Sequence, residues 1–254
     1  EVALKFCDAQ EPAMDLHCQA IHDKDLPFRD QQEVQNICTR VVSVDFYTQV
    51  YNEGVILYEP CGGIATCLEA ALRNGWRIRK YFYQDVDHSA RLVVQKRLKE
   101  FNRDYGSLFP NAAYENAFSF PNNVEELTPN ELEKAGIGND LRWVICCGSP
   151  CTGFSQAGKR RGLEDKSSKL LLEILKIIAY AQSRAKKPPV YILENAPIAS
   201  MTSSATESEQ QLINRLRAMQ GNETIVDSAQ FGALSHRCRS FWTNLLGTGM
   251  LKTM

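Results

Sequence analysis

Short apolar runs alternate with helical segments from residue 55 onward, and this alternation constrains the fold more than any other feature of the chain. The runs have the length and composition of buried strands, and the segments between them carry apolar residues at helical spacing. Strands separated by crossover helices pair in parallel. The sequence therefore predicts an α/β fold with a mostly parallel sheet and helices on both faces. The predicted strands are residues 55–58, 79–85, 143–147 and 190–193, and the predicted helices are 64–74, 88–102 and 167–184.

Weaker patterns complete the expected fold. Thr128 and Pro129, followed by Glu131, are the residue types that begin a helix. Residues 1–54 are predicted as an N-terminal helical segment, and residues 55–254 as the α/β domain. The other expected elements are a strand at 112–116, a strand pair at 223–226 and 239–243, and helices within 29–51 and at 207–219.

Composition excludes several classes of protein. The 254-residue chain carries nine cysteines, and an odd number scattered through strands and helices argues against a secreted disulfide scaffold and for a reducing compartment. No apolar run reaches the roughly 18 residues that span a bilayer, so no membrane association is predicted. The net charge of −1 limits any nucleic-acid binding to a local patch, and the densest basic run is residues 159–161.

The N-terminal segment contains histidines and cysteines, the residue types that bind zinc. Its histidines and cysteines lack the C-x-x-C spacing of a zinc knuckle, so no metal site is predicted. These residues are Cys7, His17, Cys18, His22 and Cys38.

A thiol follows the predicted strand at 143–147. The tetrapeptide Gly148-Ser149-Pro150-Cys151 puts Cys151 at the carboxyl end of a buried strand, where open α/β sheets bind their ligands. A thiolate is a strong nucleophile toward an electron-poor ring, so Cys151 is a candidate catalytic residue. The alternative is a buried, inert cysteine, which is the commoner role of this residue type.

A glycine turn and an acid indicate a nucleotide-like ligand. Gly62 and Gly63 lie between the first strand and its helix, where glycines let a ligand approach the backbone. Asp85 ends the next strand, at the position where an acid accepts hydrogen bonds from ribose hydroxyls. The turn does not fit G-x-G-x-x-G, so the sequence favours an adenosine-containing ligand other than NAD.

Further polar side chains are predicted at the same edge of the sheet. Glu194 and Asn195 follow the strand at 190–193, and a carboxylate there can contact a ring nitrogen and an exocyclic amine. Arg237 and Arg239 alternate on one predicted strand and would face the same side. The alternatives are a helix-capping Glu-Asn turn and a solvated edge strand.

Together these segments resemble the DNA (cytosine-5)-methyltransferase family, and they are most similar to its eukaryotic de novo class. The similarity covers about residues 55–247 and rests on four segments in family order. It implies the Rossmann-like sheet of S-adenosylmethionine-dependent methyltransferases. The four segments are Glu59-Pro60-Cys61-Gly62-Gly63-Ile64-Ala65-Thr66, Gly148-Ser149-Pro150-Cys151, Glu194-Asn195 and Arg237-Cys238-Arg239.

The resemblance implies S-adenosyl-L-methionine as the cofactor. Asp85 would hold its ribose, and Asn116 stands where the family usually has an acid that contacts the adenine amine. The implied cofactor-binding residues are Glu59, Pro60, Cys61, Gly62, Gly63, Ile64, Ala65, Thr66, Asp85, Val86, Asn116, Ala117, Ser149, Pro150 and Leu171.

The implied reaction is methylation of cytosine C5 in double-stranded DNA. Cys151 would add to C6 while Glu194 bonds the N3 and N4 edge of the base. Arg239 would contact the base, which must leave the duplex, and Arg237 would support Glu194 or the backbone. A nuclear location and assembly into homo- or hetero-oligomers are expected from the same resemblance. The implied DNA contacts are Lys159, Arg160, Arg161 and Asn195.

Parts of the family pattern are missing. Only fifteen residues follow Arg239, where a target-recognition segment and a closing helix normally lie. The chain also begins at Glu1, so a truncated or permuted domain is expected, and Gln35-Asn36 with the helix after it is a candidate for a relocated closing helix. Two alternatives stay open: a tRNA methyltransferase of the same family, and an accessory or remnant domain that binds cofactor or DNA. No Cys-Phe-Thr signature of the tRNA branch follows Asn195, and retention of Cys151 and Glu194 favours activity.

Overall fold

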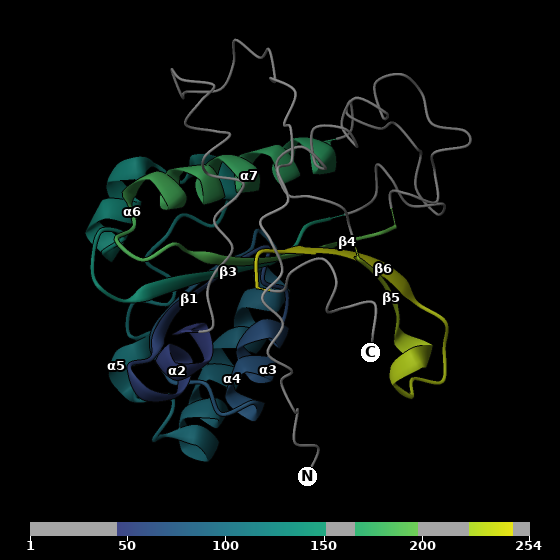
Figure 1. Ribbon diagram of the computed structural model, residues 1–254, viewed down its shortest axis with the longest axis horizontal. Helices are drawn as coiled ribbons and strands as arrows, with labels where there is room; N and C mark the ends of the chain where they lie inside the picture. The colour runs from purple at the N-terminus through teal and green to yellow at the C-terminus, as the bar shows by residue number, and fades with distance from the viewer. Residues whose placement is uncertain (1–44, 151–165, 198–223, 246–254) are drawn as a thin grey trace.

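The computed structural model describes residues 45–150, 166–197 and 224–245. Within these ranges six strands form one sheet, in the spatial order β2-β1-β3-β4-β6-β5 (Figure 1). The strands are β1 (Val55–Pro60), β2 (Ile78–Gln84), β3 (Arg142–Gly148), β4 (Val190–Asn195), β5 (Thr224–Asp227) and β6 (Cys238–Thr243).

Strand directions confirm the predicted mostly parallel α/β sheet. β1 pairs in parallel with β2 on one side and with β3 on the other, and β3 pairs in parallel with β4. β5 and β6 form the predicted late strand pair, and β6 runs antiparallel to both β4 and β5. The chain moves outward from β1 to β2 and then returns to β3 on the opposite side of β1. Such a switch point opens a crevice at the carboxyl ends of the strands, where ligands of this class of sheet bind.

Helices cover both faces of the sheet (Figure 1). Alternation along β1 explains the two layers: Ile56 and Tyr58 face one apolar cluster, whereas Val55 and Leu57 face the other. On the first face lie α6 (Pro129–Ala135) and α7 (Lys166–Arg184). On the second face lie α2 (Asp45–Asn52), α3 (Thr66–Arg73), α4 (His88–Tyr105) and α5 (Asn111–Tyr114).

The helix that the sequence places after Thr128 begins as predicted. The Thr128 hydroxyl accepts a hydrogen bond from the Glu131 amide, and the Glu131 carboxylate accepts one from the Thr128 amide. Pro129 occupies the first helical position, where its missing N–H costs nothing. Two single-turn 3-10 helices, η1 (Val124–Glu126) and η4 (Ser228–Phe231), complete the elements of the described residues.

The prediction of a strand at residues 112–116 is wrong. Residues 111–114 form the short helix α5, which follows Pro110 and contains two alanines, the best helix formers. One backbone contact lies where a further strand would pair: the Tyr83 amide donates to the Ala117 carbonyl at 2.8 Å. The prediction that Arg237 lies on a strand is also wrong, because β6 begins at Cys238.

Helix α2 belongs to the same core as the sheet. Phe46 and Val50 are buried among the residues of the second apolar cluster, and the Phe46 ring meets Trp76 edge to face. The predicted boundary at residue 54 therefore does not separate α2 from the α/β domain. The rest of the helix predicted within 29–51, the helix at 207–219, and the candidate closing helix after Asn36 lie outside the described residues.

A disulfide that the sequence did not predict joins α3 to β3. Its partners are Cys67 and Cys146, which are 79 residues apart in the chain. It links the helix that follows the glycine turn to the strand that precedes Cys151. In the part of the chain that the structure describes, no helix is both long and apolar enough to cross a membrane.

Candidate active site at the carboxyl ends of the strands

The glycine turn after β1 is tied to the end of β2 by three hydrogen bonds. The Gly62 amide donates to the Gln84 carbonyl at 3.0 Å, and the Gly63 amide donates to Asp85 Oδ2 at 2.9 Å. The Tyr83 hydroxyl donates to the Gly63 carbonyl at 2.7 Å. A Cβ on Gly62 would lie 2.6 Å from the Tyr83 ring, so only glycine fits at that position. The turn is therefore held in one shape by protein groups alone.

Glu59 is a buried acid that caps α3 from a distance. Its carboxylate accepts hydrogen bonds from the amides of Cys67 at 2.9 Å and Leu68 at 3.2 Å, and from the Tyr81 hydroxyl at 2.6 Å. The N-cap residue, Ala65, has no side chain to do this. Burial raises the pKa of Glu59 to about 7. The Cys67 and Leu68 amides at the start of α3 are therefore already occupied by Glu59.

Asp85 and Val86 extend the site beyond β2. Asp85 uses one oxygen for the Gly63 amide and the other for the Asp87 amide, each at 2.9 Å. A carboxylate has about four acceptor sites, so Asp85 keeps capacity for ribose hydroxyls. Val86 is 73% exposed and Ile64 on the glycine turn is 49% exposed. Exposed apolar side chains on both loops suit the faces of a planar ring.

Solvent access divides the predicted cofactor-binding residues into two groups. Ala65 and Ala117 are 0% exposed and Leu171 is 2% exposed within the first apolar cluster. Glu59, Pro60 and Ser149 are buried as well, and contact of these six residues with a cofactor stays a prediction. The accessible residues of the predicted set are Cys61, Gly62, Gly63, Ile64, Thr66, Asp85, Val86, Asn116 and Pro150.

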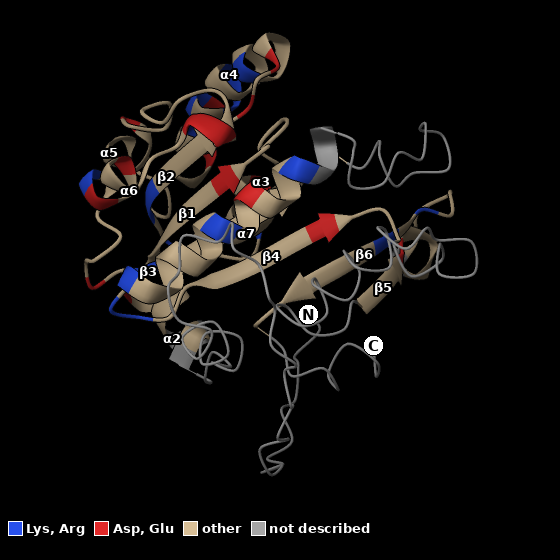
Figure 2. Ribbon diagram, turned by 90° about the horizontal axis from the view of Figure 1, so that it is seen from above, with Lys and Arg blue, Asp and Glu red and all other residues tan. Residues whose placement is uncertain are grey.

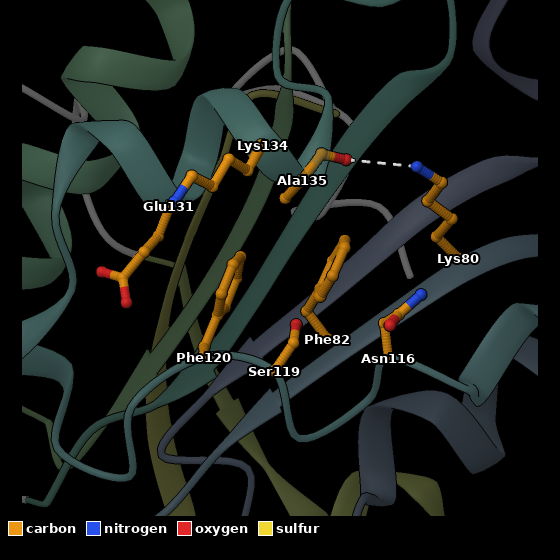
Figure 3. A pocket seen from close by; sticks show the side chains of 8 residues that line it. All are labelled: Lys80, Phe82, Asn116, Ser119, Phe120, Glu131, Lys134 and Ala135. Atoms are coloured by element: carbon orange, nitrogen blue, oxygen red, sulfur yellow. Dashed lines mark hydrogen bonds between the residues drawn. The ribbon is translucent and has the colours of Figure 1, made fainter.

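Asn116 lines a pocket beside the outer edge of β2 (Figure 3). The pocket has a volume of about 280 Å³, and the Phe82 and Phe120 rings stack there with their centroids 4.6 Å apart. Lys80 reaches across it to the Ala135 carbonyl at 3.4 Å. The other lining residues are Ser119, Glu131 and Lys134. Contact between Asn116 and an adenine amine stays a prediction.

The ends of β3 and β4 are locked together by a buried amide. Asn195 Nδ2 donates to the Ser149 hydroxyl at 2.8 Å, and Asn195 Oδ1 accepts from the Ala196 amide at 2.8 Å. Asn195 is 1% exposed and Ser149 is 5% exposed. The Asn195 side chain is buried and hydrogen-bonded within the protein, and its contact with DNA stays a prediction. This side chain positions the segment that leads into Pro150 and Cys151.

Glu194 and Arg239 form the charged pair of the site. Glu194 Oε1 lies 2.7 Å from Arg239 Nε, across the antiparallel pairing of β4 with β6. The side chains keep 31% and 24% of their surface exposed, so the pair is half-buried and still accessible. Gly148 on β3 faces Glu194, and a Cβ there would lie 3.0 Å from Glu194 Oε2. Figure 2 shows acidic positions at the carboxyl ends of β1 and β4, where Glu59 and Glu194 lie.

Arg239, and not Arg237, forms the ion pair with Glu194. Arg237 precedes β6, its side chain is exposed, and its amide donates to Asp227 Oδ1 at 2.9 Å. The predicted role of Arg237 beside Glu194 is therefore not what the described residues show. Contact of Arg239 with a base stays a prediction.

Two cysteines of β3, Cys146 and Cys147, are not nucleophiles in their described surroundings. Cys146 is in the disulfide with Cys67. Cys147 is 3% exposed, and burial, together with a hydrogen bond to Cys61, raises the pKa of its thiol. Cys151 and residues 159–161 lie outside the described residues. The strand that leads to Cys151 ends at Gly148, next to Glu194 on β4.

Two tyrosines of the site were missed in the sequence. Tyr81 and Tyr83 alternate on β2 and face the same side, where their hydroxyls bond Glu59 and the glycine turn. A tyrosine inside a buried strand needs a partner for its hydroxyl, and this requirement is the signal that would have found them. No group of three or more metal-ligating side chains occurs among residues 45–150, 166–197 and 224–245.

Comparison with known proteins gives a family match over about half of the chain, which includes β3, β4 and β6. A family model described as C-5 cytosine-specific DNA methylase matches residues 111–247. The chain is similar to the type II methyltransferase M.MspI of Moraxella sp., at 32% identity over 101 residues, which is 39% of this chain and 23% of the relative. It is also similar to M.HhaI of Haemophilus parahaemolyticus, at 40% identity over 52 residues, or 20% of this chain and 14% of the relative.

Two solved structures are similar to the chain at low identity. Dnmt2 methyltransferase of S. pombe covers 76% of this chain with a TM-score of 0.45 and 18% identity. The methyltransferase EhMeth of Entamoeba histolytica covers 77% of this chain with a TM-score of 0.47 and 15% identity. The matches span 52% and 54% of those two chains, and 11% to 27% of the curated relatives.

Proposed function

Because the chain belongs to the C-5 cytosine-specific DNA methylase family, we propose that it transfers a methyl group to C5 of cytosine in double-stranded DNA. The methyl donor is S-adenosyl-L-methionine, and the proposed nucleophile is Cys151. The nuclear location expected from the sequence is part of this proposal.

The Glu194–Arg239 ion pair carries the proposal. A cytosine accepts a nucleophile at C6 only if the negative charge that develops on the ring is relieved. Glu194 is an accessible carboxylate at the end of β4, held by Arg239 at 2.7 Å. A carboxyl at this position can bond N3 and the N4 amine, the edge that distinguishes cytosine from thymine. Arg239 fixes the direction of that carboxyl before substrate arrives, and preorganised charge is a large contribution to catalysis.

The neighbours of Cys151 support its assignment as the nucleophile. The thiols of Cys146 and Cys147 are withheld by the disulfide and by burial, respectively. Cys151 comes three residues after the end of β3, and Asn195 fixes Ser149 two residues before it. The Cys151 thiolate would form a bond to C6 of cytosine. After methylation at C5, loss of the C5 proton would release the thiolate and restore the ring, so the cysteine leaves unchanged.

The accessible residues around the glycine turn fit an adenosine-containing cofactor. A Cβ on Gly63 would meet nothing within 4 Å, so open space lies over the turn. Asp85 offers acceptors for ribose hydroxyls, and Val86 and Ile64 offer exposed apolar surface for the base. S-adenosyl-L-methionine supplies the electrophilic methyl group when it is bound. The residues of this chain would hold it, and Tyr83 and Asp85 hold the turn that would receive it.

Covalent trapping tests the proposal. Duplex DNA with 5-fluorocytosine at target positions is incubated with the protein and S-adenosyl-L-methionine, and the products are separated on a denaturing gel. Fluorine at C5 blocks the final proton loss, so we expect a protein–DNA adduct that Cys151→Ala abolishes. An adduct that persists in Cys151→Ala contradicts the nucleophile assignment.

The same assay separates the alternatives. A transfer-RNA substrate with 5-fluorocytosine that traps the protein, when duplex DNA does not, would favour an RNA methyltransferase. Cofactor binding by calorimetry without any adduct would favour an accessory domain. Asp85→Ala should weaken that cofactor binding, and an unchanged affinity would contradict the ribose contact.

A further inference from the structure

The connection between β5 and β6 projects from the same end of the sheet as Glu194. In the antiparallel pairing of β4 with β6, Glu194 lies opposite Phe241 and Asn195 lies opposite Ser240. Residues before Cys238 therefore extend past the carboxyl end of β4. Figure 1 shows this connection, with η4, standing out beyond the sheet. The projecting segment, residues 232–237, is called the β5–β6 loop below.

Hydrogen bonds at its base hold the β5–β6 loop in one shape. Asp227 Oδ1 accepts from the amides of Ala229 at 3.1 Å and Arg237 at 2.9 Å, while Asp227 Oδ2 lies 2.7 Å from His236 Nδ1. The Ser228 hydroxyl donates to the Ser235 carbonyl at 2.8 Å. Both ends of the loop are thus pinned to residues 227 and 228, so the position of its tip is fixed by the sheet.

The loop presents an exposed apolar side chain, and a histidine and an arginine follow it in the sequence. Leu234 is 108% exposed, the largest exposure among the exposed large hydrophobic residues of the described chain. The His236 side chain is 85% exposed, and Arg237 is exposed. A single exposed leucine on a protein surface needs no explanation. Leu234, however, projects from a loop whose ends are held by hydrogen bonds. It lies three residues before Arg237 and at the same end of the sheet as Glu194.

We propose that the β5–β6 loop is a DNA-contacting element, in which Leu234 packs against the bases next to the position that the flipped cytosine vacates. This inference rests on the proposed function and deepens it. Apolar side chains that enter base steps stabilise unstacked DNA, and basic side chains beside them neutralise phosphates. Arg237 contacts the backbone next to the vacated position. The loop stabilises the open form of the duplex, the form in which Cys151 and Glu194 can reach the base.

Truncation of the tip tests the inference with a matched control. Leu234→Ala is compared with Leu92→Ala, which shortens another leucine, 52% exposed, on α4. Duplex affinity is measured by fluorescence anisotropy, and the rate of adduct formation is measured with 5-fluorocytosine DNA. We expect Leu234→Ala to lower the adduct rate about 10-fold, the loss expected when one leucine no longer buries its side chain. Leu92→Ala should match the wild type, and Leu234→Met should recover most of the rate.

A mismatched target distinguishes a contact with open DNA from a general structural effect. Pairing the target 5-fluorocytosine with a non-complementary base lowers the cost of opening. The difference between Leu234→Ala and the wild type should therefore shrink on that duplex. Arg237→Ala should reduce the slope of log affinity against log salt by about 1, as expected for loss of one phosphate contact.

The outcomes separate this inference from the proposed function. An adduct formed equally fast by Leu234→Ala and the wild type on matched DNA overturns the inference and leaves the function intact. Duplex binding that depends on Leu234, without any adduct, supports the inference and overturns the proposed chemistry. No duplex binding by the wild-type protein overturns the inference.

Discussion

The Asn195 amide and the Ser149 hydroxyl, 2.8 Å apart, join the ends of two parallel strands that are adjacent in the sheet but 46 residues apart in sequence. The next residue before Asn195 is Glu194, and the second residue after Ser149 is Cys151. One buried hydrogen bond thus fixes the proposed carboxylate relative to the start of the segment that carries the proposed nucleophile.

Asn195→Ala should slow adduct formation by about 10²-fold, because a displacement of about 1 Å at a reacting group has an effect of that size. The affinity for cofactor should stay unchanged, since Asn195 does not reach the glycine turn. The free energy of unfolding should fall by about 1–3 kcal/mol, as expected for a buried hydrogen bond left without its donor. Calorimetry and urea denaturation measure the last two quantities. An unchanged adduct rate would show that Ser149 needs no anchor.

Gly148→Ala should impair catalysis without unfolding the protein. Its Cβ would lie 3.0 Å from Glu194 Oε2, so the carboxylate must move by a few tenths of an ångström. We expect the adduct rate to fall about 10-fold. Gly138→Ala is the matched control, since a Cβ there meets nothing within 4 Å. Equal rates for the two variants would indicate that Glu194 relocates at no cost.

Arg239→Ala should weaken both stability and the reaction. It leaves Glu194 half-buried without its cation, and we expect a loss of about 1–3 kcal/mol in the free energy of unfolding. Arg239→Lys keeps the charge but not the planar guanidinium, so it should restore stability more than rate. Arg237→Ala, measured beside it by urea denaturation, should change stability by less than about 0.5 kcal/mol. A larger loss for Arg237→Ala would contradict the assignment of the ion pair.

Glu59 should make stability fall as the pH rises toward neutrality. Its pKa is raised from 4.5 to about 7 by burial, so the folded state holds a proton that the unfolded chain releases. The stabilisation is fully present below pH 4.5 and is lost as the pH rises through 7, by about 3 kcal/mol in total. Glu59→Gln removes this dependence. The check is the difference between the two proteins in unfolding free energy at pH 5 and pH 8; parallel curves would show that Glu59 is ionised throughout.

Loss of the Cys67–Cys146 disulfide should destabilise the domain. The bridge closes a segment of 79 residues, for which the chain-entropy model gives about 4 kcal/mol. Cys67→Ser with Cys146→Ser should therefore unfold at lower urea concentration than the oxidised wild type. Dithiothreitol should bring the wild type to the same midpoint and leave the variant unchanged. Cys238→Ser, at an exposed free cysteine, is the control.

The sheet was predictable because its strands are short, buried and bounded by turn residues. The run from Val55 to Tyr58 is apolar throughout, as expected for a parallel strand covered on both faces, and Gly62 and Gly63 mark its turn. The strand predicted at 112–116 failed for the opposite reason. A segment of about five residues has no resolvable period, and Ala112 and Ala113 fit a helix as well as an edge strand.

The residues of the site were predictable, but their partners were not. Glu194 and Arg239 belong to recognisable segments, yet only the antiparallel register of β4 and β6 brings them within 2.7 Å. Asn195 looked like a substrate contact because polar residues at strand ends often are, whereas its side chain turns inward to Ser149. Leu171 and the Cys67–Cys146 bridge depend on how α7 and α3 pack, which no local pattern encodes.

The tethers on the glycine turn affect the thermodynamics of ligand recognition. Fixing one residue's backbone costs about 1–2 kcal/mol of conformational entropy. In this chain that ordering takes place during folding, through Gln84, Tyr83 and Asp85, and a ligand that enters later does not have to bring it about. Affinity for a cofactor is then set in part by side chains that never touch it. Tyr83→Phe, which removes the bond to Gly63, should appear in calorimetry as an added entropic penalty, with the enthalpy of the contacts themselves preserved.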